Sequence, residues 1–432
     1  MRRIILEAGE AFSESHLKRT GAFNAEALMA ATSIIEDVRA RGDVALSEYT
    51  LRFDSVALRA FRVPAEAIDA ASERVEPRTA QALAYAAARI RDFHERQKQQ
   101  SWFTVQQNGA LLGSRVSPLD SVGVYVPGGR ALYPSSVLMN AIPAQVAGVK
   151  RIVCVTPPTK EGVLDAAILE ACRIAGVTEV YSVGGAQAIA ALAYGTESIA
   201  PVAKITGPGN AYVAAAKKLV SGDVGIDMVA GPSEVCIVAD DTADASLVAI
   251  DLMAQAEHDP LAASYLVTFS ESFVDEVEAA IEGHLAASTR AKITSASLNG
   301  QGLAVVCPDI AAAFDAVNVI APEHLEICLD SAFDLLGLVR HAGAVFLGKW
   351  TPEAVGDYVA GPNHTLPTGG TARFSSPLSV DDFVKKSSVI RYSPQALVDD
   401  AAAIITIADH EGLWAHARSV EYRKRLLEGG FA

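Results

Sequence analysis

Two different spacings of hydrophobic residues divide this chain. From about residue 24 to 100, apolar residues recur every three or four positions, as in AEALMAATSIIEDVRARGD and AQALAYAAARIRDFHERQKQQ. Positions with this spacing lie on one face of a helix, because an α-helix has about 3.6 residues per turn. The pattern therefore predicts amphipathic helices in this region.

From about residue 121, short β-branched runs that end in glycine turns alternate with alanine-rich, helix-like segments. The strand candidates are VGVYVPGG, RIVCVTPP, EVYSVGG, AKITGPG, VGIDMVAGPSE and EVCIVAD, followed by a second series, SYLVTFS, LAVVC, AVNVI and GAVFLG. Strands that alternate with helices predict a mostly parallel sheet with helices on both faces. We therefore expect an α/β protein with two such sheets.

The last segment of the chain has a different character. From about residue 380 a lysine- and serine-bearing turn leads to a helical tail that ends in HARSVEYRKRLLEGGFA. This tail is too small to fold alone. We expect it to pack elsewhere on the protein or on a partner.

Composition narrows the class of protein. The chain has 432 residues, 50% of them hydrophobic, enough for a large core and two or three domains. Its formal net charge of −15 and the lack of lysine or arginine blocks argue against a nucleic-acid partner. The start, MRRIILEAGEAF, has neither the form of a signal peptide nor that of a membrane span, so a soluble, cytoplasmic protein is expected. The five scattered cysteines predict reduced core residues rather than disulfides or a thiolate metal site.

Glycine turns follow several predicted strands of the first series. They are Gly128-Gly129, Gly184-Gly185, Gly207-Pro208-Gly209 and Gly231-Pro232. Open α/β sheets bind ligands at such strand ends, where backbone N–H groups and helix N-termini converge. No GxGxxG fingerprint is present, so spacing alone leaves both a nucleotide site and ordinary tight turns open. The neighbouring Tyr125, Gln187 and Asn210 are either ligand contacts or turn and cap residues.

Gln255 and His258 are the first candidate metal ligands. In DASLVAIDLMAQAEHDP, Asp244 is a plausible N-cap and Pro260 ends the predicted helix. Gln255 and His258 then share one face of the last turn, where they either hold a metal or leave His258 near the negative end of the helix dipole.

Two later segments concentrate polar residues. GDYVAGPNHTLPTGG carries Asp357, Asn363 and His364 in a glycine- and proline-rich loop, which is typical of functional sites and also of ordinary turns. HEGLWAHARS carries His410, Glu411 and His416 on a helical stretch that is either functional or simply solvated.

The segment VIAPEHLEI sets Glu323 beside His324. If AVNVI is a strand, Pro322 occupies the first helical position and both side chains lie at a helix N-terminus. The helix dipole there favours a carboxylate and a neutral imidazole, a pair suited to sequential acid–base chemistry. The alternative is that Glu323 caps the helix and His324 fills a surface niche.

Taken together, several long segments resemble the histidinol dehydrogenase family. They are YVPGGRALYPSSVLMNAIPAQVAGV, VGGAQAIAALAYGTE, ITGPGNAYVAAAKKLVSGDVGIDMVAGPSE, AQAEHDP, APEHLEI, GDYVAGPNHTLPTGGTARFSSPLSVDDFVKKSS and HEGLWAHARS. They occur in the family's order over about residues 120 to 420. The resemblance implies two incomplete, doubly wound, Rossmann-like domains and a zinc-dependent, NAD-linked enzyme. Its implied reaction is the oxidation of L-histidinol to L-histidine through L-histidinal, the final two steps of histidine biosynthesis.

The resemblance also implies which parts of the chain belong together. Residues 1–23 form an N-terminal segment, residues 24–100 pack with 235–370 as the larger domain, and residues 120–234 form a second domain with the NAD-contacting turns. Residues 380–432 complete the partner subunit's site in a homodimer, and no membrane or nucleic acid is involved.

Residue roles follow from the same resemblance. One zinc ion per subunit is held by Gln255, His258, Asp357 and His416, the last of which comes from the other subunit together with Glu411. The substrate contacts Ser233, His324, His364 and Glu411 as well as the metal ligands, and NAD contacts Tyr125, Gln187 and Asn210. His324 takes the alcohol proton, and Glu323 activates water for the aldehyde step.

The sequence bears on three rival functions. A dehydrogenase of the same fold could act on another small polyol, although the intact Glu411, His364 and SSPLSVDDF favour histidinol. A non-enzymatic metal-binding protein would have little need of the Glu323–His324 pair. A zinc hydrolase finds no support, because the sequence has no HExxH motif.

Overall fold

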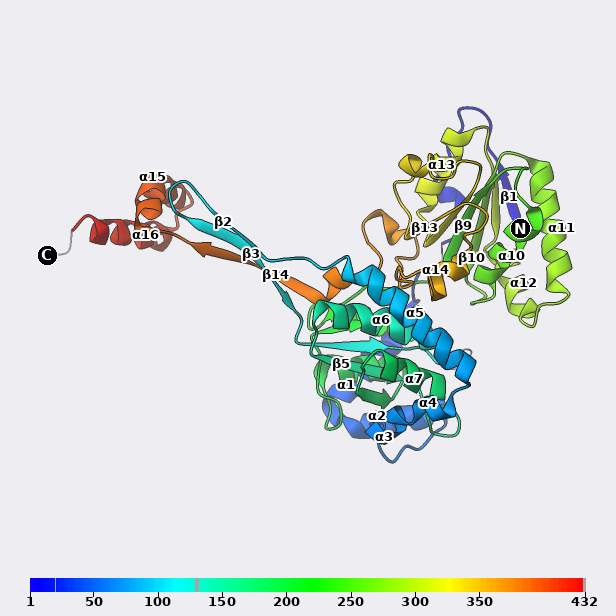
Figure 1. The fold of residues 1–432 in the computed structure, drawn as a ribbon, viewed down its shortest axis with the longest axis horizontal. Helices are drawn as coiled ribbons and strands as arrows, with labels where there is room; N and C mark the ends of the chain where they lie inside the picture. The colour runs from blue at the N-terminus through cyan, green and yellow to red at the C-terminus, as the bar shows by residue number, and fades with distance from the viewer. Residues whose placement is uncertain (20, 129–131, 430–432) are drawn as a thin grey trace. The chain divides into compact units, whose positions relative to one another are not determined.

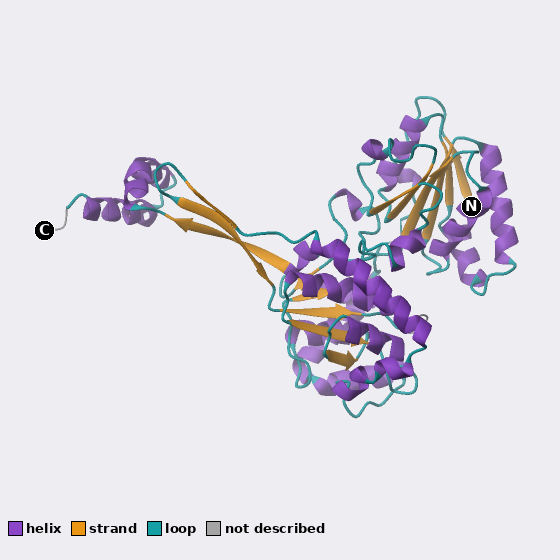
Figure 2. Ribbon diagram, in the orientation of Figure 1, coloured by secondary structure: helices purple, strands orange, loops and turns teal. Residues whose placement is uncertain are grey.

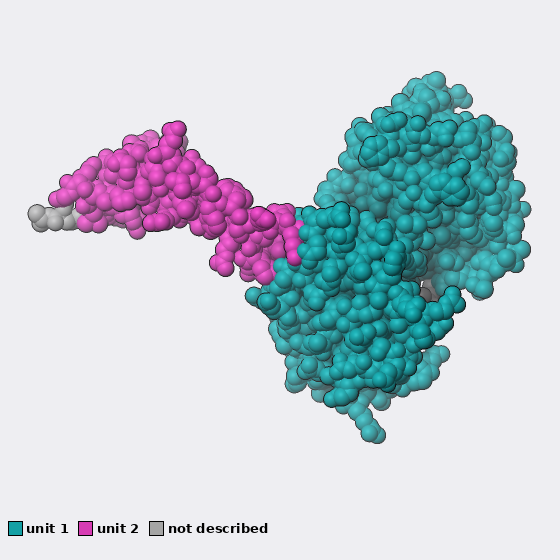
Figure 3. All heavy atoms as spheres, viewed as in Figure 1, with its two compact units in different colours: residues 1–97, 119–383 teal, residues 98–118, 384–432 magenta. Residues whose placement is uncertain are grey.

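The computed structural model describes residues 1–19, 21–128 and 132–429. The chain forms two compact units, shown in Figure 3. The first comprises residues 1–97 and 119–383, and the second residues 98–118 and 384–432. The first unit contains two parallel sheets, and the second contains an antiparallel sheet and two helices.

A six-stranded sheet in the first unit is parallel throughout (Figure 1). Its strands, in spatial order, are β1 (Arg2–Ile5), β11 (Leu303–Val306), β10 (Ala263–Thr268), β9 (Glu234–Ala239), β12 (His324–Cys328) and β13 (Ala344–Leu347). Side chains alternate between its faces, so that Val235 and Ile237 pack with α10 (Ala245–Ala256), α11 (Glu271–Leu285) and α12 (Ala291–Gly300). Cys236 and Val238 pack with α13 (Ile310–Ile320) on the other face.

A five-stranded sheet in the same unit is also parallel. Its order is β6 (Glu179–Ser182), β5 (Arg151–Thr156), β4 (Ser121–Tyr125), β7 (Lys204–Thr206) and β8 (Gly225–Ile226). Both sheets carry helices on their two faces (Figure 2). The predicted α/β class with two doubly wound, Rossmann-like sheets is confirmed.

The helices from residues 25 to 95 pack against the five-stranded sheet. One face is covered by α1 (Ala25–Arg41), α2 (Asp43–Asp54), α8 (Gly185–Tyr194) and α9 (Ala211–Val220). The other face is covered by α3 (Ala65–Asp69), α4 (Ala71–Arg74), α5 (Pro77–Glu95), α6 (Pro134–Ala147) and α7 (Ala166–Ile174). The packing expected for residues 24–100, against 235–370, is therefore wrong. Their apolar faces are buried with residues of the 120–234 segment, and the six-stranded sheet instead takes up β1 from the N-terminal segment.

The assignment around residue 320 also differs from expectation. AVNVI is the end of helix α13 and not a strand, and Ala321 closes that helix in the left-handed conformation with a φ of 46°. Pro322 and Glu323 follow outside regular structure, and His324 begins strand β12. The Glu323–His324 pair therefore lies at the start of a strand, not at a helix N-terminus.

The second unit holds the segment between α5 and β4 together with the C-terminal tail. Strands β2 (Trp102–Val105), β3 (Leu111–Pro118) and β14 (Val384–Arg391) form an antiparallel sheet in the order β14-β3-β2. The lysine- and serine-bearing segment predicted as a turn is strand β14, paired along its whole length with β3. The tail continues as α15 (Pro394–His410) and α16 (Trp414–Leu427), and residues 430–432 lie outside the described part.

All five cysteines are free, four of them buried and Cys328 partly so, as predicted. Within the described residues, no helix is both long and apolar enough to cross a membrane.

Candidate functional site

Three side chains from segments that pack around the six-stranded sheet form a cluster able to hold a metal ion. The ligand atoms of His258, Glu353 and Asp357 all lie within 4.8 Å of one another. Glu353 and Asp357 are four residues apart on α14 (Glu353–Tyr358), so both project from one face of that helix. His258 lies in the turn just after α10, where its N–H donates to the Gln255 carbonyl.

Gln255 joins this cluster from the last turn of α10. Its side chain is fully buried, and its amide, oriented with the nitrogen toward Glu353, donates to both carboxylate oxygens at 2.9 and 3.1 Å. The structure thus brings together three residues singled out in the sequence, Gln255, His258 and Asp357. Glu353 was missed, although its position four residues before Asp357 on a helix is a spacing that could have revealed it.

The histidines around the cluster are suited to binding a cation. Burial lowers the pKa of both His258 and His364, which favours the neutral imidazole that a metal requires. His364 donates from Nδ1 to the carbonyl oxygen of Asp357 at 3.1 Å, which leaves Nε2 as its acceptor atom. A site of imidazole, carboxylate and amide donors without thiolate fits zinc or a related divalent ion.

His324 lies beside the cluster and is almost completely buried. Its Nδ1 is 3.8 Å from oxygens of both Glu323 and Glu353, and its Nε2 is 3.6 Å from Asp357 Oδ1. Burial lowers the pKa of His324, but the three carboxylates outweigh burial and raise it to about 10. The expectation of a neutral imidazole set by a helix dipole is therefore wrong for this arrangement, because carboxylates surround the ring and no helix begins there.

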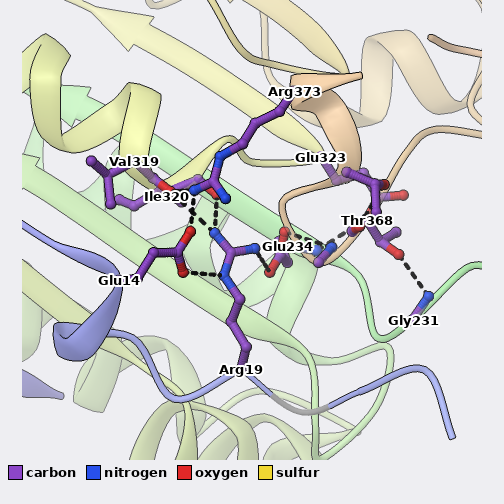
Figure 4. Close-up of polar contacts among 11 residues, drawn as sticks. Glu14, Arg19, Gly231, Glu234, Val319, Ile320, Glu323, Thr368 and Arg373 are labelled. Atoms are coloured by element: carbon purple, nitrogen blue, oxygen red, sulfur yellow. Dashed lines mark hydrogen bonds and ion pairs between the residues drawn. The ribbon is translucent and has the colours of Figure 1, made fainter. Parts of the chain in front are cut away.

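Glu323 is held by the start of strand β9, as Figure 4 shows in part. Its Oε2 accepts the backbone N–H of Glu234 at 3.0 Å, and the Ser233 hydroxyl also donates to this carboxylate. Burial raises the pKa of Glu323 to about 7 despite these donors. A carboxyl group with this pKa can exchange a proton near neutral pH, which suits a general base.

Buried Glu326 and half-buried Asp251 form a carboxyl pair next to the cluster. Glu326 is two residues after His324 on β12, so its side chain is on the same face of the strand. Its Oε1 accepts the backbone N–H of Glu353 at 2.7 Å, and its side chain hydrogen-bonds Asp251 of α10. Burial raises the pKa of Glu326 to about 8 and that of Asp251 to about 6, so the pair retains a proton near neutral pH. This pair connects α10, β12 and α14, the elements that carry the site.

The residues predicted to contact a nucleotide lie at the carboxyl ends of the five-stranded sheet. Tyr125 ends β4, and its buried hydroxyl accepts the Gly185 N–H at 3.1 Å. Gln187 lies in the first turn of α8 and is 1% exposed, and within the described residues its side-chain oxygen has no hydrogen-bond partner. Asn210 caps α9 by accepting the N–H groups of Tyr212 and Val213. Of the Gly128-Gly129 turn, Gly129 lies outside the described residues.

The Gly207 turn at this edge is fixed by a buried ion pair. The Gly207 N–H donates to Asp227 Oδ2 and its carbonyl accepts from Lys217 Nζ, both at 2.8 Å, while Lys217 and Asp227 pair directly. A side chain at Gly207 would meet the Tyr125 carbonyl oxygen at 2.1 Å, so only glycine fits there.

We expect Lys217→Met to lower the free energy of unfolding by about 3–5 kcal/mol, because it leaves Asp227 buried without its cation. Urea denaturation followed by circular dichroism would measure this change. Lys218→Met is the matched control, since Lys218 is the next residue after Lys217 and is exposed. That control should change stability by less than about 0.5 kcal/mol. Equal effects of the two substitutions would contradict a role for the buried pair.

Known proteins similar to this chain show its family. The family described as histidinol dehydrogenase matches residues 17–424 of the chain. The chain is 53% identical to histidinol dehydrogenase of Bacillus subtilis (strain 168) over 395 residues, which cover 91% of this chain and 92% of that protein. It is 54% identical to the protein of the same name from Geobacillus kaustophilus, over 91% and 93% of the two chains. The chain belongs to the histidinol dehydrogenase family.

A solved structure extends the comparison to three dimensions. The crystal structure of histidinol dehydrogenase from Elizabethkingia anophelis superposes with a TM-score of 0.92 at 35% sequence identity, and the match covers 99% of each chain. The fold described above is therefore that of a solved member of the histidinol dehydrogenase family.

Two of the residues assigned to the site by family resemblance belong to the second unit. Glu411 follows directly after α15, and His416 is the third residue of α16. Both side chains are exposed. Their assignment to the site of a partner subunit stays a prediction.

Proposed function

We propose that this protein is a zinc-dependent, NAD-linked histidinol dehydrogenase that oxidises L-histidinol to L-histidine through L-histidinal. The observation that carries the proposal is the buried Glu323–His324 pair in a chain of this family. His324 of this pair lies 3.6 Å from the Asp357 carboxylate and 3.8 Å from that of Glu353, two members of the cluster able to hold a metal. Two proton-handling groups beside one cluster suit two successive oxidations at one carbon atom.

The donor set supports zinc as the metal. We assign Gln255, His258 and Asp357 as ligands from one subunit and His416 from the other. The hydrogen bonds from Gln255 occupy the Glu353 carboxylate, so Glu353 would orient the Gln255 amide rather than replace it as a ligand. Bound zinc would hold the imidazole and amine nitrogens of histidinol and so fix the carbinol carbon in place.

His324 is assigned as the group that removes the alcohol proton. The surrounding carboxylates favour its protonated form, and a divalent cation at the cluster would offset their charge and favour the neutral form. Neutral His324 can accept the hydroxyl proton while hydride leaves the carbon atom, which gives the aldehyde.

Glu323 is assigned to the second oxidation. Its carboxylate, fixed by Ser233 and by the N–H of Glu234, would take a proton from water as that water adds to the aldehyde. The resulting hydrate has an alcohol-like C–H and O–H, so it can lose hydride in the same way as the first substrate.

NAD is the expected hydride acceptor, two molecules for each histidinol. The turns at Tyr125, Gln187 and Asn210 share one edge of the parallel sheet, the usual place for a cofactor in such folds. The buried oxygen of Gln187, which has no hydrogen-bond partner among the residues that the structure describes, fits this interpretation, because a buried polar atom ordinarily has a partner.

The decisive experiment follows NADH formation from the purified protein with NAD and L-histidinol, before and after chelation and zinc restoration. We expect two NADH per histidinol, lost with chelator and recovered with zinc. A folded, zinc-loaded protein that forms no NADH from histidinol would contradict the proposal, and activity on other small polyols would then be the question.

A further inference from the structure

Arg19 connects the N-terminal segment to the region around Glu323, as Figure 4 shows. It follows the short helix η1 (Glu14–His16) in sequence. Its Nη2 donates to the carbonyl oxygens of Val319, at 3.2 Å, and Ile320. These are the last residues of α13, and Glu323 is three positions beyond Ile320.

The same guanidinium faces the buried carboxylate of Glu234. Arg19 Nη1 lies 3.7 Å from Glu234 Oε1, which is too long for a hydrogen bond and close enough for a strong electrostatic attraction in a buried setting. The Glu234 side chain is 5% exposed and its Oε2 accepts the Gly369 N–H at 3.1 Å. Arg19 also lies 3.3 Å from Glu14, so it bridges two carboxylates.

Both sets of contacts converge on Glu323. On one side, Arg19 holds the end of the helix that leads into Glu323. On the other side, it offsets the charge of Glu234, whose backbone N–H holds the Glu323 carboxylate. We propose that Arg19, acting through Glu234 and the end of α13, is a positioning residue for Glu323 in the aldehyde step. The inference rests on the proposed function, because the proposed function assigns Glu323 to the aldehyde step.

Arg373 offers a matched comparison within the same group of side chains (Figure 4). It also pairs with Glu14 and donates to the Val319 carbonyl, from the short helix η3 (Thr371–Arg373). Among the residues that the structure describes, Arg373 has no ion pair with Glu234. The two arginines therefore share their contacts with Glu14 and Val319, and among the described residues Arg19 alone adds contacts with Ile320 and Glu234.

The test compares Arg19→Met with Arg373→Met in the zinc-loaded enzyme. NADH formation is measured separately from histidinol and from supplied histidinal. For Arg19→Met we expect kcat on histidinal to fall on the order of 10- to 100-fold with little change in KM, because Glu323 loses its alignment with the water. Oxidation of histidinol to the aldehyde should fall much less. Arg373→Met should keep both steps within about twofold of the wild type, as expected for a partly exposed ion pair.

Two further variants test the route through Glu234. The double variant Arg19→Met/Glu234→Gln removes the uncompensated charge, so it should recover the part of the aldehyde step that Arg19→Met loses through Glu234 and be faster than Arg19→Met. If Arg19→Met fails to fold, Arg19→Lys takes its place in the test, because lysine keeps the positive charge. It should still slow the aldehyde step severalfold, because an ammonium cannot reproduce the fork of donors that spans the carbonyls and Glu234.

Distinct results would overturn the inference and the proposed function. If the wild type oxidises both substrates, any of three results would overturn the positioning role alone. These are equal losses in Arg19→Met and Arg373→Met, a double variant no faster than Arg19→Met, and a fully active Arg19→Lys. A wild-type enzyme that oxidises neither histidinol nor histidinal would overturn the proposed function instead.

Discussion

Glu323→Gln is expected to slow aldehyde oxidation by about 10²- to 10⁴-fold while oxidation of histidinol to the aldehyde stays within about tenfold of the wild type. Glutamine keeps the shape of the side chain and can still accept the Glu234 N–H, but it cannot take a proton from water. His324, the assigned base of the first step, remains. Stopped-flow measurement of the first and second NADH, with histidinal as a separate substrate, would resolve the two steps.

The same carboxyl group should determine how the second step responds to pH. Because burial raises the pKa of Glu323 to about 7, its carboxylate form is lost as the pH falls through that value. The rate of the aldehyde step in the wild type should therefore fall below about pH 7, and this limb should be absent in Glu323→Gln. Equal loss of both steps in the variant would remove the role assigned to Glu323.

Mixed dimers should regain activity from two inactive chains. His258→Ala and His416→Ala are each expected to reduce zinc content and to abolish most activity, since each removes an assigned ligand. If His416 serves the other subunit's site, a dimer with one chain of each kind has one site with both defects and one intact site. A purified mixed dimer, isolated through two different affinity tags, should then show about half of the wild-type activity.

The control for this experiment lies on the same tail. His410 is exposed at the end of α15 and has no assigned role, so His410→Ala should keep full zinc content and activity. Mixed dimers that stay inactive, although they fold and exchange subunits normally, would place all of the ligands within one chain.

The sequence predicted the two sheets because buried parallel strands are short apolar runs rich in β-branched residues, as in RIVCVT and EVCIVA. The same criterion failed for AVNVI, since a short apolar run also fits the buried end of a helix such as α13. The packing of α1 to α5 was mispredicted because an amphipathic face shows that a helix is buried without showing which sheet covers it.

The site was predictable only in part for a related reason. Gln255, His258 and Asp357 stand in motifs that resemble a known family, so they could be identified without a structure. Arg19, Glu234 and Glu326 act through contacts between segments distant in sequence. Arg19 reaches a carbonyl 301 positions away, and no local pattern encodes such a contact.

The hydrogen bonds around α14 bear on how the protein should behave without the proposed zinc ion. Glu326 holds the first N–H of this helix, and Gln255 holds Glu353, so the ligand-bearing ends of α10 and α14 are joined by protein contacts alone. Such a site is preorganised, unlike that of a zinc finger, where the metal supplies the folding free energy. A chelated preparation should therefore stay folded, and adding zinc should restore its activity without a refolding step.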